Sequence, residues 1–307
     1  MASPITKAGF PDLLDPRMRE ITYDTFQLQK DMVGYFYEMA ESTQDPERGS
    51  DITPMGDMSE FTGTISFDGP DQAYDWLSNP REFALGMQIE RRVWEYDQFG
   101  IIDKMFTRLG NSAHRTRQKH AARVFNNSFS DDTYFYDTTE NVALCSNSHT
   151  TTRSGVSTAT GFDNLSTDGL TPTALGAAIT QFRKFKDLAG ERINVLPDLL
   201  VVPVDLRDRA LEIVKTASGL DSAEGTVNVY NSDYNFKVLD WVYLTDVNDW
   251  WLCDSRFMKN NLTWFERVPV EFARVEAFDE ILAKYRAYMM YTIKRGVWQW
   301  VNGSQVS

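Results

Sequence analysis

The 307-residue sequence contains few cysteines and few histidines, with two and three respectively. Two cysteines are too few for a disulfide framework, which favours a reducing compartment. The first ten residues lack the basic and apolar segments of a signal peptide, and no apolar run has membrane length. We therefore expect neither export through a cleaved leader nor a membrane partner.

Motifs that hold phosphates, nucleotides or catalytic metal ions are also missing. The sequence has no Gly-rich phosphate loop, no dinucleotide fingerprint, no nucleophile elbow and no His-Glu-x-x-His. His114 and His120 are six residues apart on different sides of a predicted helix, and we expect them to be solvated. We expect no catalytic residues, no cofactor-binding residues, no metal ligands and no cofactor.

Cys145 and His149 are the one pair that could supply a nucleophile and a base, within Cys-Ser-Asn-Ser-His. Thiol hydrolases do not usually take both groups from one short segment, so a buried cysteine near a turn histidine is the favoured interpretation. A zinc site at this pair would need further ligands.

Charge is unevenly distributed along the chain, whose net charge is −13. Residues 45–97 hold twelve acidic residues, four arginines and no lysine. Residues 104–130 hold six basic residues and no acidic one. Adjacent segments of opposite charge fit a surface that pairs with another copy of the chain. Ordinary solvated faces explain the same pattern, and the basic segment could also touch nucleic acid without sequence preference.

Residues 45–97 are predicted to form a long hairpin. Apolar and polar residues alternate over 61–67 and again over 83–89, which predicts two strands. Two strands bury too little apolar surface to be stable alone. Either the body of the same chain or another subunit must therefore cover the hairpin.

The remaining segments predict helices and strands in separate blocks, which indicates an α+β fold. Residues 1–44 read as an arm with few partners in the sequence, and we expect it to lie on another subunit. The tryptophans at 250, 251, 264, 298 and 300 are expected in the core, with a carbohydrate-stacking or base-stacking platform as the alternative. The predicted helices span 18–39, 98–127, Thr171 to Gly190 and Asp205 to Gly219, and the predicted strands span 199–202, 226–230, 236–244, 249–253, 262–272 and 285–293.

This order of segments resembles the tailed-phage major capsid proteins of the Hong Kong 97 type. Local sequences are similar to the branch that contains the Mu-like head subunit, and the likeness covers residues 45–300. The similar segments are 110–113 (Gly-Asn-Ser-Ala), 121–129 (Ala-Ala-Arg-Val-Phe-Asn-Asn-Ser-Phe), 143–149 (Ala-Leu-Cys-Ser-Asn-Ser-His), 197–203 (Pro-Asp-Leu-Leu-Val-Val-Pro) and 249–254 (Asp-Trp-Trp-Leu-Cys-Asp).

The resemblance implies an α+β, Hong Kong 97-like capsid fold. It also implies a virion protein, not an enzyme, that assembles in the host cytoplasm as pentamers and hexamers into an icosahedral shell around double-stranded DNA. The alternatives are an encapsulin-like protein compartment and a soluble enzyme that uses Cys145 and His149. The implied segments are an N-terminal arm at 1–44, an extended loop and return strand at 45–97, a spine helix and part of the peripheral domain at 98–139, an axial domain at 140–255 and the C-terminal strands of the peripheral domain at 256–307.

By the same resemblance, contacts between subunits are expected in the extended loop and on the spine helix. The expected contact residues are Phe61, Ile65, Phe67, Arg115, Arg117, Lys119 and Arg123.

The expected partners are other copies of the chain, a separate scaffolding protein, a portal, a decoration or cement protein, and DNA bound non-specifically. A separate scaffold is expected because only about forty residues precede the hairpin. No lysine lies between Lys30 and Lys104, which excludes the lysine-based weld from the extended loop that some relatives use.

Overall fold

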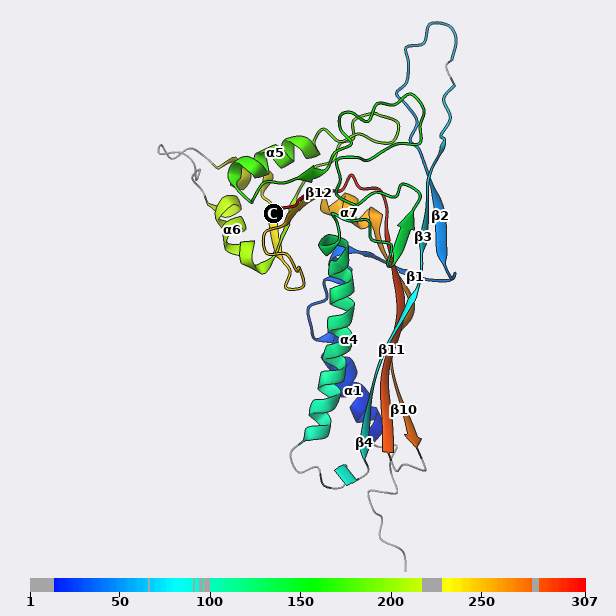
Figure 1. The fold of residues 1–307 in the computed structure, drawn as a ribbon, viewed down its shortest axis with the longest axis vertical. Helices are drawn as coiled ribbons and strands as arrows, with labels where there is room; N and C mark the ends of the chain where they lie inside the picture. Colours follow the sequence, from blue (N-terminus) through cyan, green and yellow to red (C-terminus); the bar gives the residue numbers. More distant parts are fainter. Residues whose placement is uncertain are drawn as a thin grey trace, which may run out of the picture.

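The computed structural model describes residues 14–65, 67–90, 92–93, 96, 100–216, 228–277 and 282–307. In its lower part the long helix α4 (Ile101–Asn126) stands beside a tall sheet (Figure 1). The upper part carries α5 (Pro172–Phe182) and α6 (Arg207–Lys215). A loop between β2 (Glu47–Ile52) and β3 (Gln72–Ser78) extends beyond both parts.

The lower sheet has the strand order β1-β10-β11-β4. Its long strands β10 (Leu262–Ala277), β11 (Leu282–Arg295) and β4 (Arg81–Glu90) pair antiparallel, whereas β1 (Glu38–Glu41) pairs parallel with the start of β10. The predicted strands at 83–89, 262–272 and 285–293 are confirmed. Because alternate side chains of a strand share a face, the odd-numbered residues from 285 to 293 all lie buried beneath the helices.

Helix α4 confirms the helix predicted for 98–127, and its apolar stripe of Ile102, Phe106, Leu109 and Ala113 is buried. Helix α1 (Leu14–Gln27) packs along it. A Cβ atom at Gly110 would lie 2.7 Å from the carbonyl oxygen of Thr22, so this glycine permits the close approach of α1. Residues 14–41 of the predicted arm therefore have partners within their own chain, whereas residues 1–13 lie outside the described residues. A contact of this arm with another subunit stays a prediction.

The helix predicted for 18–39 is interrupted. α1 ends at Gln27, and a short helix α2 (Val33–Phe36) follows before β1. The side chain of Asp31 accepts a hydrogen bond of 2.9 Å from the backbone nitrogen of Val33, which favours a new start there over a continuous helix.

The upper sheet has the order β6-β12-β9-β7-β8. Its strands are β6 (Leu165–Ser166), β12 (Val301–Ser304), β9 (Trp250–Cys253), β7 (Leu199–Val202) and β8 (Lys237–Asp240). β12 comes from the C-terminal end of the chain and lies between β6 and β9. The last strand thus leaves the lower sheet and completes the upper one, across the boundary predicted at residue 255.

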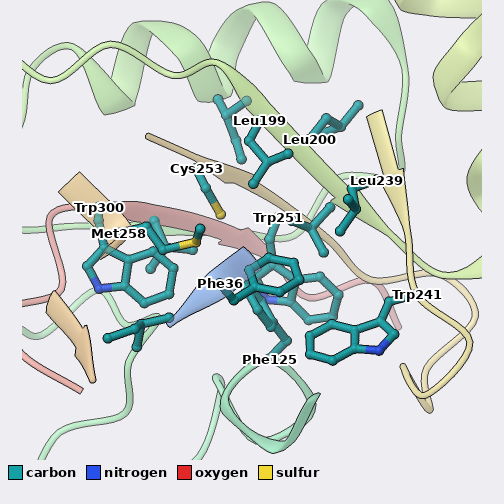
Figure 2. Packing of buried hydrophobic residues seen from close by; sticks show 14 of the residues in the cluster. Phe36, Phe125, Leu199, Leu200, Leu239, Trp241, Trp251, Cys253, Met258 and Trp300 are labelled. Carbon is teal, nitrogen blue, oxygen red and sulfur yellow. The ribbon is translucent and has the colours of Figure 1, made fainter. Parts of the chain in front are cut away.

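The main core joins the two parts of the molecule (Figure 2). The ring of Phe36 stacks on Trp241 at 4.8 Å between centroids and contacts Phe125 of α4 at 5.2 Å. Trp251 of β9 packs against Phe125 from the sheet side. All five tryptophans predicted for the core are buried, which confirms that prediction and leaves them unavailable as a stacking platform.

The start of α5 follows the prediction, since the Thr171 side chain accepts a hydrogen bond of 3.1 Å from the backbone nitrogen of Ala174. Its predicted end at Gly190 is wrong. The helix stops at Phe182, and the chain then turns back through a bridge between Lys186 and Arg192.

The helix predicted to begin at Asp205 begins later in the structure. Asp205 lies in the 3-10 turn η3 (Val204–Leu206), and α6 begins after this turn. A π-helix, η4 (Tyr230–Tyr234), replaces the strand predicted for 226–230 over its described residues. Asn228 donates hydrogen bonds to the carbonyl oxygens of Ile213 and Thr216, which turns the chain against α6. The predicted helix end at Gly219 lies outside the described residues.

The strand β5 (Tyr136–Thr138) and the helix α7 (Ser255–Asn261) are among the elements that the sequence patterns did not predict. Asp254 caps α7 by accepting hydrogen bonds from the backbone nitrogens of residues 256 and 257. Along the described part of the chain, no helix combines the length and apolar character needed to cross a bilayer.

Candidate assembly interface

The hairpin that carries the extended loop differs from the predicted one. Its strands are β2 and β3, which pair antiparallel, and β5 adds a third strand beside β3. Residues 61–65 form no strand, and β4 pairs with β11 instead of with them. Alternation alone does not make a strand, because the backbone also needs a neighbour to accept its hydrogen bonds.

The extended loop, residues 53–71 apart from residue 66, exposes large apolar side chains. Phe61 is 70% exposed, Ile65 64% and Phe67 94%. Met55 and Met58 are exposed as well. The loop also contains four acidic residues and no basic one. A cluster of exposed aromatic and aliphatic side chains is typical of a protein–protein contact, so the three predicted contact residues in this loop are free to meet a partner.

The base of the extended loop is fixed by polar contacts. The backbone nitrogen of Thr53 donates to the carbonyl oxygen of Asp71 at 2.9 Å. The Asp68 carboxylate accepts from Arg153 at 2.7 Å and from the backbone nitrogen of Gly56 at 2.8 Å. The hydrogen bond from Arg153 is the largest cause that lowers the pKa of Asp68. Arg153, which was not among the predicted contact residues, thus ties the loop to the segment that follows β5.

The basic residues of α4 divide into two groups. Lys104, Arg108, Arg115 and Lys119 are exposed. They are separated by four, seven and four residues, so they share one face of the helix. We call these four residues the basic stripe. Arg115 and Lys119, two of the predicted contact residues, therefore lie at the surface.

Arg117 and Arg123 are matched within the chain. Arg117 is buried, and its guanidinium lies 3.1 Å from the carboxylate of Glu266. Arg123 makes two hydrogen bonds of 2.7 and 2.8 Å to the carboxylate of Asp132. Both of these predicted contact residues thus have acidic partners within their own chain, and a contact of either with another subunit stays a prediction.

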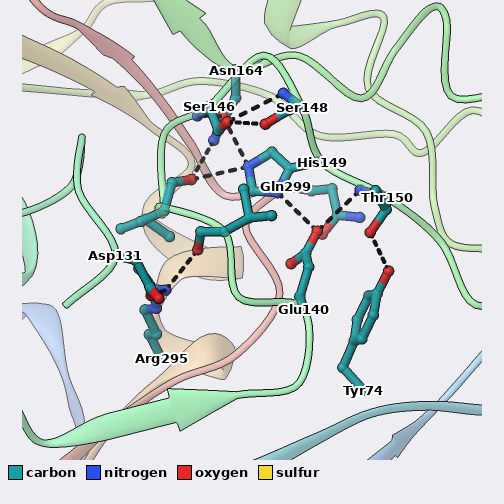
Figure 3. Close-up of polar contacts among 12 residues, drawn as sticks. Tyr74, Asp131, Glu140, Ser146, Ser148, His149, Thr150, Asn164, Arg295 and Gln299 are labelled. Carbon is teal, nitrogen blue, oxygen red and sulfur yellow. Dashed lines mark hydrogen bonds and ion pairs between the residues drawn. The ribbon is translucent and has the colours of Figure 1, made fainter. Parts of the chain in front are cut away.

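His149 lies in a buried polar cluster and not in a catalytic pair (Figure 3). Its Nδ1 atom is 3.1 Å from the carboxylate of Glu140, and its ring stacks on Trp298 at 4.4 Å. Its Nε2 atom lies 3.3 Å from the carbonyl oxygen of Leu144. Burial raises the pKa of the Cys145 thiol to about 12. A nucleophilic cysteine needs the opposite shift, so both residues serve the packing of this turn.

Both cysteines are fully buried, which predicts slow alkylation of the native protein near neutral pH. Mass spectrometry after iodoacetamide treatment should find Cys145 and Cys253 unmodified in the folded protein and modified in denaturing urea. Rapid labelling of Cys145 alone in the native protein would contradict the structural role and restore the enzyme alternative.

The other two histidines are not solvated, contrary to expectation. His114 is buried, and His120 is half-buried with its Nδ1 atom 2.7 Å from the hydroxyl of Tyr291. Burial lowers the pKa of His120 to about 4. Among the described residues, no group of three side chains could hold a metal ion.

A family model described as phage capsid protein matches residues 78–301. The sequence matches no curated protein. The structure is similar to the mature capsid of bacteriophage PhiM1, with TM-score 0.59 and 10% identity over 91% of this chain and 87% of that chain. It is also similar to a chain of Microbacterium phage Oxtober96, with TM-score 0.57 and 10% identity over 99% and 100% of the two chains.

A virus-like particle from Pyrococcus furiosus has TM-score 0.54 and 9% identity over 94% of this chain and 98% of that chain. At such identities these similarities establish the fold alone. The family model matches most of the chain, and this match identifies the family to which the chain belongs. The chain therefore belongs to the phage capsid protein family and is a major capsid protein with the Hong Kong 97-like fold.

Proposed function

We propose that this capsid protein self-assembles as pentamers and hexamers into an icosahedral shell around the double-stranded DNA of a tailed phage. The observation that carries the proposal is the extended loop, whose apolar side chains are exposed and which reaches beyond the body of the subunit (Figure 1). We propose that Phe61, Ile65 and Phe67 bury their side chains against a neighbouring subunit.

The fixed base of the loop supports this proposal. Hydrogen bonds around Asp68 and Arg153 hold the two ends of the loop together, so fewer conformations are lost when the loop docks. Burial of one phenylalanine side chain contributes about 1.5–3 kcal/mol. A shell repeats the same contact at every subunit, so contacts that are modest singly add up to a stable assembly.

The family resemblance suggests a role for each part of the fold. We propose that α4 is the spine helix and that the lower sheet, with β4 included, forms the peripheral domain. The upper sheet, with β12 included, forms the axial domain that meets its copies at the symmetry centres.

The encapsulin-like alternative has the similarity to the Pyrococcus furiosus particle in its favour. The match to the phage capsid family favours a phage shell. We also propose that the role is structural and not enzymatic, because His149 and Cys145 are committed to packing.

Further partners are proposed from the resemblance alone. They are a scaffolding protein, a portal and a decoration or cement protein, with assembly in the host cytoplasm before the shell becomes part of the virion. Since the extended loop contains no lysine, its contacts with neighbours would be non-covalent.

Negative-stain electron microscopy of the purified full-length protein tests the proposal. Closed shells, or pentamers and hexamers that close when a scaffold is added, are the expected result. A protein that stays monomeric at high concentration, with and without scaffold, would contradict it. Analysis of the shells' contents separates the two shell hypotheses, because a phage head holds DNA and an encapsulin-like compartment holds protein.

A further inference from the structure

We infer that the basic stripe of α4 is a contact surface for the phosphate backbone of the packaged DNA and not for a neighbouring subunit. This inference rests on the proposed function, since it requires a shell that encloses double-stranded DNA. The sequence left both partners open for these residues, and the exposure and charge of the side chains around them favour DNA.

The exposed face of α4 consists almost entirely of basic residues. After Ile101 at its start, the exposed residues of α4 are the four basic residues of the stripe and Asn111. From Lys104 to Lys119 the helix rises about 22 Å at 1.5 Å per residue. A DNA duplex presents about 13 phosphate charges over that length, at one charge per ~1.7 Å. The stripe can therefore lie along a duplex and meet several phosphates at once.

Three acidic groups at α4 are already paired with residues outside the stripe. Asp103 is 2.8 Å from the guanidinium of Arg17. Asp132 holds Arg123 at the other end of the helix. Asp31 accepts a hydrogen bond from a glutamine amide of α4 at 2.6 Å. None of the four basic side chains of the stripe has a carboxylate partner among the described residues. The stripe keeps its full positive charge in an otherwise acidic protein.

The extended loop of a neighbour fits this stripe poorly. The loop mixes acidic residues with Met58, Phe61 and Phe67, which need an apolar surface to gain free energy on docking. The stripe offers no exposed apolar side chain between its charges. One of the loop's acids, Asp68, is already paired with Arg153. A polyphosphate requires only positive charge and hydrogen-bond donors, which the stripe supplies.

The expected contact is weak and sensitive to salt. The logarithm of the DNA-binding constant falls with the logarithm of the salt concentration by about 0.9 for each phosphate that a cation contacts. Four such contacts give a slope of about −3.6. The remaining surface carries excess negative charge and repels DNA, so contact stays confined to the stripe. Such binding positions DNA against the shell without preventing it from sliding.

Lysine acylation of assembled particles tests the inference. DNA-filled particles and particles emptied of DNA are treated with a small amine-reactive reagent, and modified lysines are quantified by mass spectrometry. Lys104 and Lys119 should react at least about ten-fold more slowly in the filled particles. Lys259, which is exposed on α7, serves as the reference lysine.

Two results would overturn the inference. Slow reaction of Lys104 and Lys119 in both kinds of particle would show that a neighbouring subunit covers the stripe. Fast reaction of these lysines in both kinds of particle would show that the stripe is exposed to solvent even when DNA is present. If no particles form at all, the proposed function has failed, and that result is distinct from both.

A quadruple variant provides a second test. Replacing the four residues of the stripe with glutamine should leave shell assembly unchanged and should remove the salt slope of about −3.6 for capsomers binding a short duplex. The matched control replaces four other exposed basic residues with glutamine: Arg183, Lys184, Arg192 and Lys259. Loss of assembly in the stripe variant but not in the control would assign the stripe to a subunit contact and overturn the inference.

Discussion

Replacing Phe61 and Phe67 together with serine should abolish shell formation and leave the subunit folded. Both side chains are largely exposed in the single subunit, at 70% and 94%, so their loss should change the free energy of unfolding by less than about 0.5 kcal/mol. In the shell, each replacement would remove about 1.5–3 kcal/mol of the free energy gained when a phenylalanine side chain is buried. A combined loss near 4 kcal/mol raises the concentration needed for assembly about a thousand-fold. Sedimentation velocity would measure the loss of particles.

The matched control for this variant is Phe61→Leu with Phe67→Leu. Leucine keeps an apolar side chain at both positions, so the control should still assemble at a modestly higher concentration. Urea unfolding of all three proteins checks that the subunit itself is intact. If the serine variant assembles like the unmodified protein, these side chains are not buried between subunits.

Reversing the charge of Arg117 should destabilise the subunit itself. Its guanidinium is buried between the carboxylates of Glu266, at 3.1 Å, and Asp31, at 4.0 Å. It also lies over the ring of Trp264, at 5.2 Å from the ring centroid. Arg117→Glu would place a third carboxylate in this site and remove the neutralising charge. The expected loss is about 3–5 kcal/mol of unfolding free energy, measured by urea titration.

Arg115→Glu is the control, because this residue lies two positions away on the exposed face of the same helix. It should change the free energy of unfolding by less than about 0.5 kcal/mol. Equal effects of the two reversals would contradict the buried ion pair.

Local patterns in the sequence predicted the elements that depend on local order. The apolar spacing from Ile102 to Ala113 gave α4, and Thr171 followed by Pro172 gave the start of α5. The apolar run at 199–202 gave β7, and alternation gave most of β10 and β11. In each case, neighbouring residues alone set the face that is buried.

Long-range pairing could not be predicted in this way. β12 inserts between β6 and β9, which are far away in the sequence. No residue of 301–304 indicates which strands β12 pairs with. Residues 61–67 alternate as a strand would, but the described residues of this segment have no partner strand. The alternation instead distributes exposed apolar side chains along the extended loop.

The candidate interface was predicted in part. The exposure of Phe61, Ile65 and Phe67 agrees with a role in contacts between subunits. Arg117, in contrast, is buried and paired with Glu266 of its own chain. A signal for Arg117 was present in the sequence, since it stands four residues after Ala113 and four before Ala121, on the buried stripe of α4. The ion partner of Arg153 could not be predicted, because Asp68 lies 85 residues earlier in the chain.

Cryo-electron microscopy of the assembled particle gives the most direct view of the extended loop. We expect density for residues 53–71 against an adjacent subunit, with the rings of Phe61 and Phe67 removed from water. A reconstruction in which this loop folds back onto the subunit that carries it, or stands in solvent with no neighbour within contact distance, would contradict the account.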